Sequence, residues 1–381
     1  MSSGLREKIR SFDPNLPLEQ AHTIPNTWYF DPEIYAAECQ AVFGNVWQVA
    51  ARQDQVAEPG SFCTMDIAGE PILIVRDTEG TLRAFFNVCR HRAARVAYES
   101  AGKATRLRCR YHGWTYDLAG RLRGTPEFEG VRDFRREEEG LVELEVGTWG
   151  PLGWVRPKSN SIGGAPRPTL AEFLAPLPET TSRLGLEALS FVERREYVLE
   201  CNWKVFVDNY LDGGYHINTI HPSLAGVLDY SQYRTEIAGY TSVQTSPLRP
   251  AAPANDSDAT AKVRSGAAAY YCWIFPNLMM NIYEGLMDTN LVLPLGPHRC
   301  KVIFDFYFAN TEGPAAARII ADSIAVADQV QTEDGTICED VQRGLASRSF
   351  NTGRFSVRRE KAGYHFHQLL ARYLEGASTG G

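Results

Sequence analysis

Two pairs of thiol and imidazole side chains lie in the first third of the chain. One residue separates Cys89 from His91, two separate Cys109 from His112, and 17 residues stand between the pairs. Two thiolates and two imidazoles suit either zinc or a two-iron cluster in which histidines replace two cysteines on one iron. Because zinc sites usually contain a Cys-x2-4-Cys knuckle, the single-residue gap favours the iron–sulfur cluster.

A second set of metal-binding side chains lies near the middle of the chain, in an amphipathic segment over 201–221. His216 and His221 are five residues apart, which places them about 140° apart on an ideal helix. To converge on one metal, the two rings require the helix to widen or to end between them, near Gly213 and Gly214. Each glycine inside a helix costs roughly 1 kcal/mol relative to alanine, so the presence of two also indicates irregular structure at this point. With a carboxylate, the two histidines would form the site that leaves positions open for O₂ on non-haem Fe(II).

The residue pattern alone does not identify that carboxylate. Acidic residues are spread along a predicted late helix, where most should be solvated charges; the candidates are Asp322, Asp328, Glu333, Asp334, Glu339 and Asp340. Nearer the histidines, we expect Asp208, Asn209 and Tyr215 to line the site or to hold the histidine rings, whose second nitrogen usually needs an acceptor. Two histidines packed in an ordinary helix core are the alternative interpretation.

The elements that would position these residues fall into three segments. Residues 1–43 contain a polar arm and a helix that begins at Asp31-Pro32, an N-cap followed by proline. Short β-like runs separated by turns fill residues 44–155, which predicts a compact all-β domain. After a stretch rich in Pro, Gly and Ser, residues 156–381 are expected to contain strands over 190–199, 269–283 and 290–308, a small polar loop over 250–268, and helices over 313–345 and 359–374.

Composition excludes several classes of protein. Of 381 residues, 44% are apolar and 22% are charged, as in ordinary globular proteins. The net charge of −7 argues against a nucleic-acid partner, which would need a basic surface. No apolar run approaches roughly 18 residues, so we expect no membrane span, and the polar start is not a signal peptide. Eight cysteines are too sparse for a disulfide scaffold, which favours the reducing cytoplasm.

Together with the Tyr-His-Gly-Trp ending at 111–114, the Cys-x-His-x17-Cys-x2-His pattern resembles the [2Fe–2S] motif of Rieske non-haem iron oxygenases, specifically the α subunits of the ring-hydroxylating enzymes. The resemblance implies an α+β protein: an all-β Rieske domain over 44–155, and an antiparallel sheet packed by helices, of helix-grip type, formed by 156–381 with 1–43. In this family a late Glu-Asp-x-x-Ile-x-Glu segment supplies the iron carboxylate. The matching segment 333–339 implies Asp334 as the ligand, with Glu333 as the next choice.

The chain departs from the family pattern just before the first histidine. Many members carry an acid three residues earlier, hydrogen-bonded between the two metal centres, but that position here is Gly213. Asp212, one residue earlier, faces His216 by i,i+4 spacing if the segment is helical. We therefore expect Asp212 to replace the usual acid, with Asn209 and Asp208 as further catalytic candidates.

Several other segments resemble the choline monooxygenase branch of the family, which includes glycine betaine, carnitine and stachydrine oxygenases. They are Trp203–Phe206, Asp208–Asp212, Pro276–Asn281, Met287–Asn290 and Cys338–Leu345. A quaternary ammonium substrate would need an aromatic box, because cation–π attraction recognises a charge that cannot donate hydrogen bonds. Tyr271, Trp273 and Phe275 share one face of a predicted strand, Tyr283 lies farther along it, and Tyr215 stands next to His216; ordinary sheet packing is the alternative.

The resemblance implies a terminal oxygenase component. Electrons would pass through a Rieske [2Fe–2S] cluster to mononuclear Fe(II), where O₂ is the co-substrate. The chain has no Gly-rich nucleotide-binding segment after a strand, so NAD(P)H would act only indirectly, through a separate reductase or ferredoxin. The family also implies a homotrimer. An aromatic-ring dioxygenase is the alternative within the family, and a non-catalytic Rieske electron carrier the alternative outside it.

Overall fold

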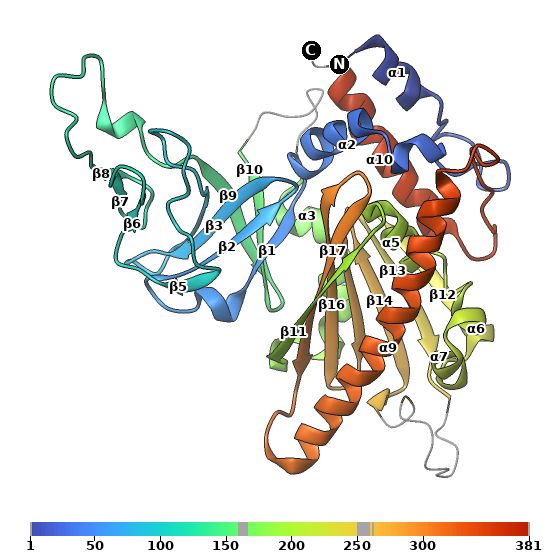
Figure 1. Ribbon diagram of the computed structural model, residues 1–381. Helices are drawn as coiled ribbons and strands as arrows, with labels where there is room; N and C mark the ends of the chain where they lie inside the picture. Colours follow the sequence, from blue (N-terminus) through green and yellow to red (C-terminus); the bar gives the residue numbers. More distant parts are fainter. Residues whose placement is uncertain (1, 159–166, 250–259, 261–262, 380–381) are drawn as a thin grey trace. The chain divides into compact units, whose positions relative to one another are not determined.

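The computed structural model describes residues 2–158, 167–249, 260 and 263–379, and it divides into two compact units (Figure 1). The first unit contains residues 1–42 and 161–381, and the second contains residues 43–160. These limits lie close to the predicted domain boundaries. Part of the expected linker, residues 159–166, and most of the expected loop over 250–268 lie outside the described residues.

The second unit is built from antiparallel strands. Its larger sheet has the order β1-β10-β9-β4-β3-β2-β5, and a small sheet has the order β6-β7-β8. The strands are β1 Gln48–Arg52, β2 Ser61–Ile67, β3 Glu70–Arg76, β4 Leu82–Phe86, β5 Ala101–Lys103, β6 Leu107–Arg108, β7 Thr115–Tyr116, β8 Leu122–Gly124, β9 Glu143–Trp149 and β10 Leu152–Pro157. The predicted all-β character of this segment is confirmed.

One buried cluster joins the two sheets of this unit. Leu73 and Val75 of β3 and Phe85 of β4 pack with Cys89 and Cys109, and all five are nearly inaccessible to solvent. β-Branched and aromatic residues favour such pleated, buried surfaces. The cysteines are therefore fixed by the main core of the unit, although the loops that carry them contain little regular structure.

The first unit contains a seven-stranded antiparallel sheet in the order β11-β17-β16-β15-β14-β13-β12. The strands are β11 Ser190–Leu199, β12 Arg234–Ala238, β13 Thr241–Pro247, β14 Ala268–Ile274, β15 Leu278–Tyr283, β16 Leu286–Gly296 and β17 Arg299–Phe308. The strands predicted over 269–283 and 290–308 are each a hairpin. Each turn contains a proline, Pro276 or Pro297, inside a segment that was predicted to be a single strand.

The helices of this unit are α1 Ser3–Arg10, α2 Pro32–Glu38, α3 Leu170–Leu174, α4 Leu177–Thr181, α5 Trp203–Tyr210, α6 Ile217–Ile220, α7 Pro222–Val227, α9 Gly313–Leu345 and α10 Lys361–Thr379. The predicted helix over 313–345 is confirmed at both ends, and Asp31 caps α2 as predicted by accepting from Glu33 N. The long helix α9 runs diagonally across the sheet, and α5 lies between this helix and strands β16 and β17 (Figure 1). The α+β class predicted from the sequence is confirmed.

An ion pair with no solvent exposure fixes the start of α5. Lys204 Nζ lies 2.7 Å from Glu38 Oε1 at the end of α2, and Trp203 Nε1 donates to Glu38 Oε2 at 3.0 Å. Buried charges are tolerated only when they are paired in this way. On the other side, Trp203 packs edge-to-face on Phe366 of α10. The helix that leads to the two histidines is thus held on both sides.

Candidate active site

The central segment is two short helices joined by a glycine turn, and not a continuous helix. After α5 ends, Gly213 and Gly214 adopt φ values of 70° and 71°, which residues with a Cβ rarely adopt. A Cβ on Gly213 would lie 2.2 Å from the carbonyl oxygen of Arg359. No larger residue fits, and the turn carries His216 to the start of α6 and His221 to its end.

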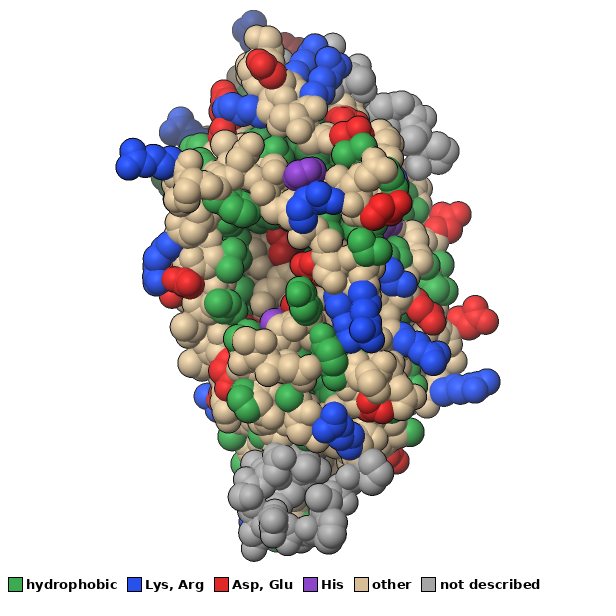
Figure 2. All heavy atoms as spheres, turned by 90° about the vertical axis from the view of Figure 1, so that its right-hand side faces the viewer, with side chains coloured by type: hydrophobic (Ala, Val, Ile, Leu, Met, Phe, Trp, Pro, Cys, Tyr) green, Lys and Arg blue, Asp and Glu red, His purple; other side chains and the backbone are tan. Residues whose placement is uncertain are grey.

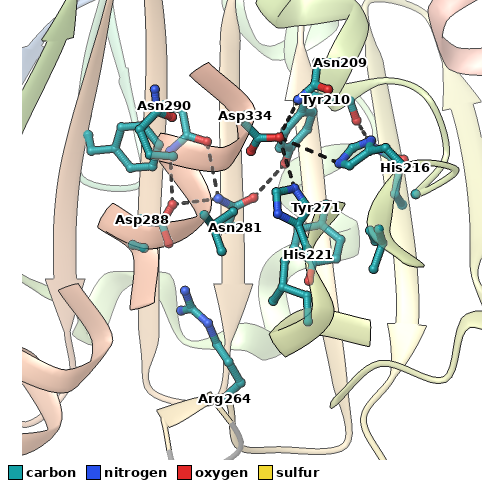
Figure 3. A pocket seen from close by; sticks show the side chains of 18 of the residues that line it. Asn209, Tyr210, His216, His221, Arg264, Tyr271, Asn281, Asp288, Asn290 and Asp334 are labelled. Carbon is teal, nitrogen blue, oxygen red and sulfur yellow. Dashed lines mark hydrogen bonds and ion pairs between the residues drawn. The ribbon is translucent and has the colours of Figure 1, made fainter. Parts of the chain in front are cut away.

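These histidines converge with one carboxylate from α9. The candidate ligand atoms of His216, His221 and Asp334 all lie within 4.8 Å of one another. Asp334 Oδ1 is 3.0 Å from His221 Nε2 and 3.9 Å from His216 Nε2. Figure 3 shows the Asp334 carboxylate beside both imidazoles, joined to each by a dashed line. Two imidazoles and one carboxylate are the donor set of a non-haem Fe(II) site with open positions, so these residues fit such an iron.

Each histidine is held by a second carboxylate. Asp212 Oδ2 lies 2.5 Å from His216 Nδ1, and Glu333 Oε2 lies 2.6 Å from His221 Nδ1. Because a carboxylate only accepts, each Nδ1 carries the proton and each Nε2 keeps its lone pair for the metal. Burial lowers the pKa of His221, but hydrogen bonds and charges from Asp334 and Glu333 outweigh it and raise that pKa. Glu333, the second choice for the iron ligand, instead orients the ring of His221.

Asn209 and Asp208, adjacent on α5, have different surroundings. Asn209 Nδ2 donates to Asp334 Oδ1 at 2.7 Å and therefore orients the ligand carboxylate. Asp208 instead accepts from Tyr29 Oη at 2.6 Å and from His367 Nε2 at 2.9 Å. It borders a neighbouring cavity of about 230 Å³ and does not line the cavity beside the iron ligands. Asp208 therefore contacts neither iron-ligand histidine, and of the two residues only Asn209 lines both cavities.

A cavity of about 90 Å³ adjoins the three ligand residues. This volume exceeds the roughly 10–15 Å³ that one water needs, so a small organic molecule fits. The cavity is lined by aromatic and polar side chains, among them Tyr210, Tyr233, Tyr271, Tyr283, Asn281 and Asp288. On the face of the molecule that carries α6 and α7, a hollow exposes acidic and histidine side chains (Figure 2).

Three of the predicted aromatic residues do not line this cavity. Tyr271, Trp273 and Phe275 belong to one strand face, but Trp273 packs on Phe366 of α10 and Phe275 stacks on Tyr373. Trp273 and Phe275 lie under α10, farther along the chain than Tyr271. Alternation along a strand predicts which face a side chain is on, but not which neighbouring element covers that part of the face. Tyr215 is 57% exposed to solvent. Of the five predicted aromatic residues, Tyr271 and Tyr283 line the cavity, whereas Trp273, Phe275 and Tyr215 do not.

The second unit brings together the two Cys and His pairs in two similar loops. Ala93 N donates to Cys89 O, and Gly113 N donates to Cys109 O, both at 3.0 Å. The rings of His91 and His112 have centroids 4.6 Å apart. Among the described residues, His91 Nδ1 is buried without a hydrogen-bond partner. A buried ring nitrogen with no partner, beside two buried thiols, fits a [2Fe–2S] cluster bound by two cysteines and two histidines.

Family models match both units. A model of the Rieske [2Fe-2S] domain matches residues 46–135, and a model of the ring hydroxylating alpha subunit catalytic domain matches residues 186–376. The chain is a Rieske non-haem iron oxygenase. A [2Fe–2S] cluster, mononuclear iron and O₂ are thus the cofactors and co-substrate of this oxidoreductase, as the sequence predicted.

Known Rieske oxygenases resemble the chain over nearly its whole length. Choline monooxygenase of Arabidopsis thaliana is 39% identical and covers 98% of this chain and 88% of its own length. The carnitine monooxygenase oxygenase subunit of Escherichia coli K12 is 28% identical over 94% of this chain and 95% of its own. A crystal structure of the quaternary ammonium Rieske monooxygenase CntA with L-carnitine has a TM-score of 0.77, with 26% identity over 94% and 99% of the two chains.

Sequence reasoning missed several residues of this Rieske oxygenase site. Tyr116 Oη lies 3.4 Å from Cys89 Sγ and accepts from Arg90 N at 3.0 Å. Its position two residues after the Tyr-His-Gly-Trp ending was the only signal. Tyr233 and Arg264 line the cavity from segments that carry no motif.

No helix among the described residues is long and apolar enough to cross a membrane.

Proposed function

We propose that this oxygenase hydroxylates a C–H bond beside the nitrogen of a small quaternary ammonium compound, with oxidative demethylation when the carbon belongs to an N-methyl group. The observation that carries the proposal is the cavity next to His216, His221 and Asp334, lined by the rings of Tyr271 and Tyr233. These two rings are nearly parallel, with centroids 6.3 Å apart and an interplanar angle of 13°. Tyrosine faces attract a cation that donates no hydrogen bonds.

The reaction consumes O₂, two electrons and two protons; one oxygen atom enters the C–H bond and the other leaves as water. The bound iron would supply O₂ activation. The chain's own residues prepare the site: Asp212 and Glu333 fix the tautomer of the two histidines, and Asn209 orients the carboxylate of Asp334. Such carboxylate and amide partners raise ligand basicity and hold the ring planes.

Electrons would come from a separate reductase or ferredoxin and enter at the cluster, whose His112 is exposed to solvent. We further propose a homotrimer in which the cluster of one chain serves the iron of another. In that assembly Asp212, already bonded to His216, would be the acid next to the neighbouring cluster. None of the described cysteines forms a disulfide, which supports a reducing compartment such as the cytoplasm.

A single-turnover assay tests the substrate class. Chemically reduced protein is mixed with O₂ and, in turn, with choline, glycine betaine, L-carnitine and simple aromatic acids, and products are read by mass spectrometry. We expect an aldehyde or a demethylated amine from an ammonium compound. A dihydrodiol or phenol would contradict the proposal and favour the aromatic-ring dioxygenase.

A further inference from the structure

A buried arginine projects into the substrate cavity. Arg264 is 7% exposed and lines the same cavity as His216, His221 and Asp334. In Figure 3 its side chain enters from the side away from His216, with the guanidinium directed toward Asp288. The cation therefore lies where a substrate can reach it.

The backbone around Arg264 is anchored to the sheet. Its N–H donates to Thr260 O at 3.0 Å, and Ser265 O accepts from Glu284 N at 3.3 Å. Gly266 has φ of 110°, and a Cβ there would lie 2.9 Å from the Glu284 side chain. These contacts hold Arg264 beside the end of β15, so the guanidinium is positioned by the fold.

Among the described residues the guanidinium forms no hydrogen bond and no ion pair, although burial raises the pKa of Asp288 in the same cavity and the charge of Arg264 acts in the opposite direction. Its Nε atom is buried and unpaired, and its Cζ lies 4.5 Å from the centroid of the Tyr283 ring. Asp288 does not form an ion pair with it: Oδ2 of Asp288 accepts instead from Asn281 Nδ2 at 2.7 Å and Asn290 Nδ2 at 3.1 Å. A buried guanidinium without an acceptor is costly, which indicates that a ligand supplies one.

The cavity therefore has two kinds of charge recognition. The faces of Tyr233 and Tyr271 suit a quaternary ammonium group, whereas the face of Tyr283 is already occupied by Arg264. The planar fork of arginine matches a carboxylate with two hydrogen bonds. A substrate that is only a cation would meet the like charge of Arg264 in a buried, weakly screening site, while the carboxylate of Asp288 in the same cavity is already held by Asn281 and Asn290.

We propose that Arg264 binds a substrate carboxylate, so that the substrate is a small zwitterion, a betaine with a quaternary ammonium at one end and a carboxylate at the other. This inference rests on the proposed function and narrows it, because it disfavours cationic alcohols such as choline. Arg264 is a specificity-determining residue in this assignment, and the iron ligands are unaffected by it.

The test measures binding and oxidation separately on the iron-loaded protein. Dissociation constants are obtained by anaerobic titration calorimetry for three compounds: glycine betaine, its carboxamide analogue, in which a neutral amide replaces the carboxylate, and choline. Single-turnover oxidation follows with the same three compounds. We expect the wild-type protein to bind glycine betaine far more tightly than either cation, and Arg264→Gln to weaken betaine binding on the order of 100-fold while leaving the two cations unchanged or bound more tightly.

Two further variants separate a specific contact from a general loss. Arg264→Lys keeps the charge but not the fork and should retain part of the preference for the betaine. Arg249→Gln removes the same charge from an exposed position and should change nothing. A folded Arg264→Gln that weakens all three compounds equally overturns the inference, because the arginine would then be structural.

The outcomes distinguish this inference from the proposed function. If choline or the amide is bound and oxidised as well as glycine betaine, and Arg264→Gln has no effect on that preference, the quaternary ammonium function stands and the carboxylate contact is wrong. If none of the three is bound or oxidised, both fail together. An Arg264-dependent oxidation of glycine betaine alone supports both.

Discussion

The cluster loops and the iron site differ in how their ligands are supported. The pairs Cys89–His91 and Cys109–His112 come from two tight turns that share the core of one β unit. The histidines of the iron site and Asp334 come from segments more than a hundred residues apart, and each histidine ring rests on its own carboxylate. The cluster site, which passes electrons, exposes His112 to solvent. The iron site, where O₂ reacts, instead borders a cavity inside the protein that limits access of water.

The comparison predicts that the two sites can be emptied independently. Asp334→Ala should lose the mononuclear iron and lower product formation by roughly 10³-fold or more, since the metal supplies several kcal/mol. The visible spectrum of the cluster should remain. Iron analysis and the optical spectrum measure both. Asp340→Ala, on an exposed position of the same helix, is the control, and loss of the cluster signal in the Asp334 variant would contradict independence.

Removing a carboxylate behind a histidine should have a smaller effect. Glu333→Gln keeps the shape but weakens acceptance from His221 Nδ1, which we expect to reduce iron affinity or activity about 10–100-fold. Competition with a chelator measures the affinity. Glu339→Gln on the same helix accepts only from a backbone N–H, at Glu200, and should leave iron affinity unchanged. Equal losses in both variants would mean that α9, not the histidine contact, is responsible.

The cluster unit should respond through redox potential. Because Tyr116 Oη accepts from Arg90 N, its own hydrogen is free to point at Cys89 Sγ. Tyr116→Phe removes a donor that stabilises the more negative, reduced cluster. The potential should fall by roughly 20–60 mV, the one-electron equivalent of a hydrogen bond worth about 0.5–1.5 kcal/mol. Redox titration of the optical spectrum measures it, with Tyr98→Phe as the matched control; a rise in potential would be the opposite result.

The last prediction concerns the stability of the cluster unit in acid. Asp77 accepts from the backbone of Glu79 and Thr81 and from Arg83 Nε. Burial raises the pKa of Asp77, but the hydrogen bonds, with that from Arg83 the largest, outweigh it and hold the pKa below its ordinary value. A depressed folded-state pKa stabilises the fold above the unfolded pKa, about 3.9, and this contribution is lost as the pH falls through the folded value.

Asp77→Asn should therefore lower the free energy of unfolding by about 1–3 kcal/mol at pH 7, and the difference from the wild type should shrink below about pH 4. Urea unfolding followed by fluorescence at several pH values measures it. Asp66→Asn breaks an exposed ion pair with Arg95 and should change the free energy by a few tenths of a kcal/mol at most. A pH-independent loss for Asp77→Asn would contradict the titration argument.

The cluster ligands were predictable because both pairs lie in one contiguous motif whose spacing is dictated by the metal. The two iron histidines were predictable for the same reason, but Asp334 required a family resemblance, since several acids on α9 have similar sequence surroundings. Tyr271 and Trp273 share a strand face, and only the position of α10 decides which of them reaches the cavity. Arg264 lies inside the segment 250–268, which was predicted to be a small polar loop, so nothing local predicted its burial.

The glycine turn before His216 has a consequence for how relatives are recognised. With the carbonyl of Arg359 in the way, position 213 accepts only glycine, and the carboxylate reaches the imidazole from position 212. A pattern search that demands an acid three residues before the first histidine would reject this chain. Searches for such oxygenases should also accept the pattern Asp-Gly-Gly-x-His, in which the aspartate four residues before the histidine makes the carboxylate–imidazole contact.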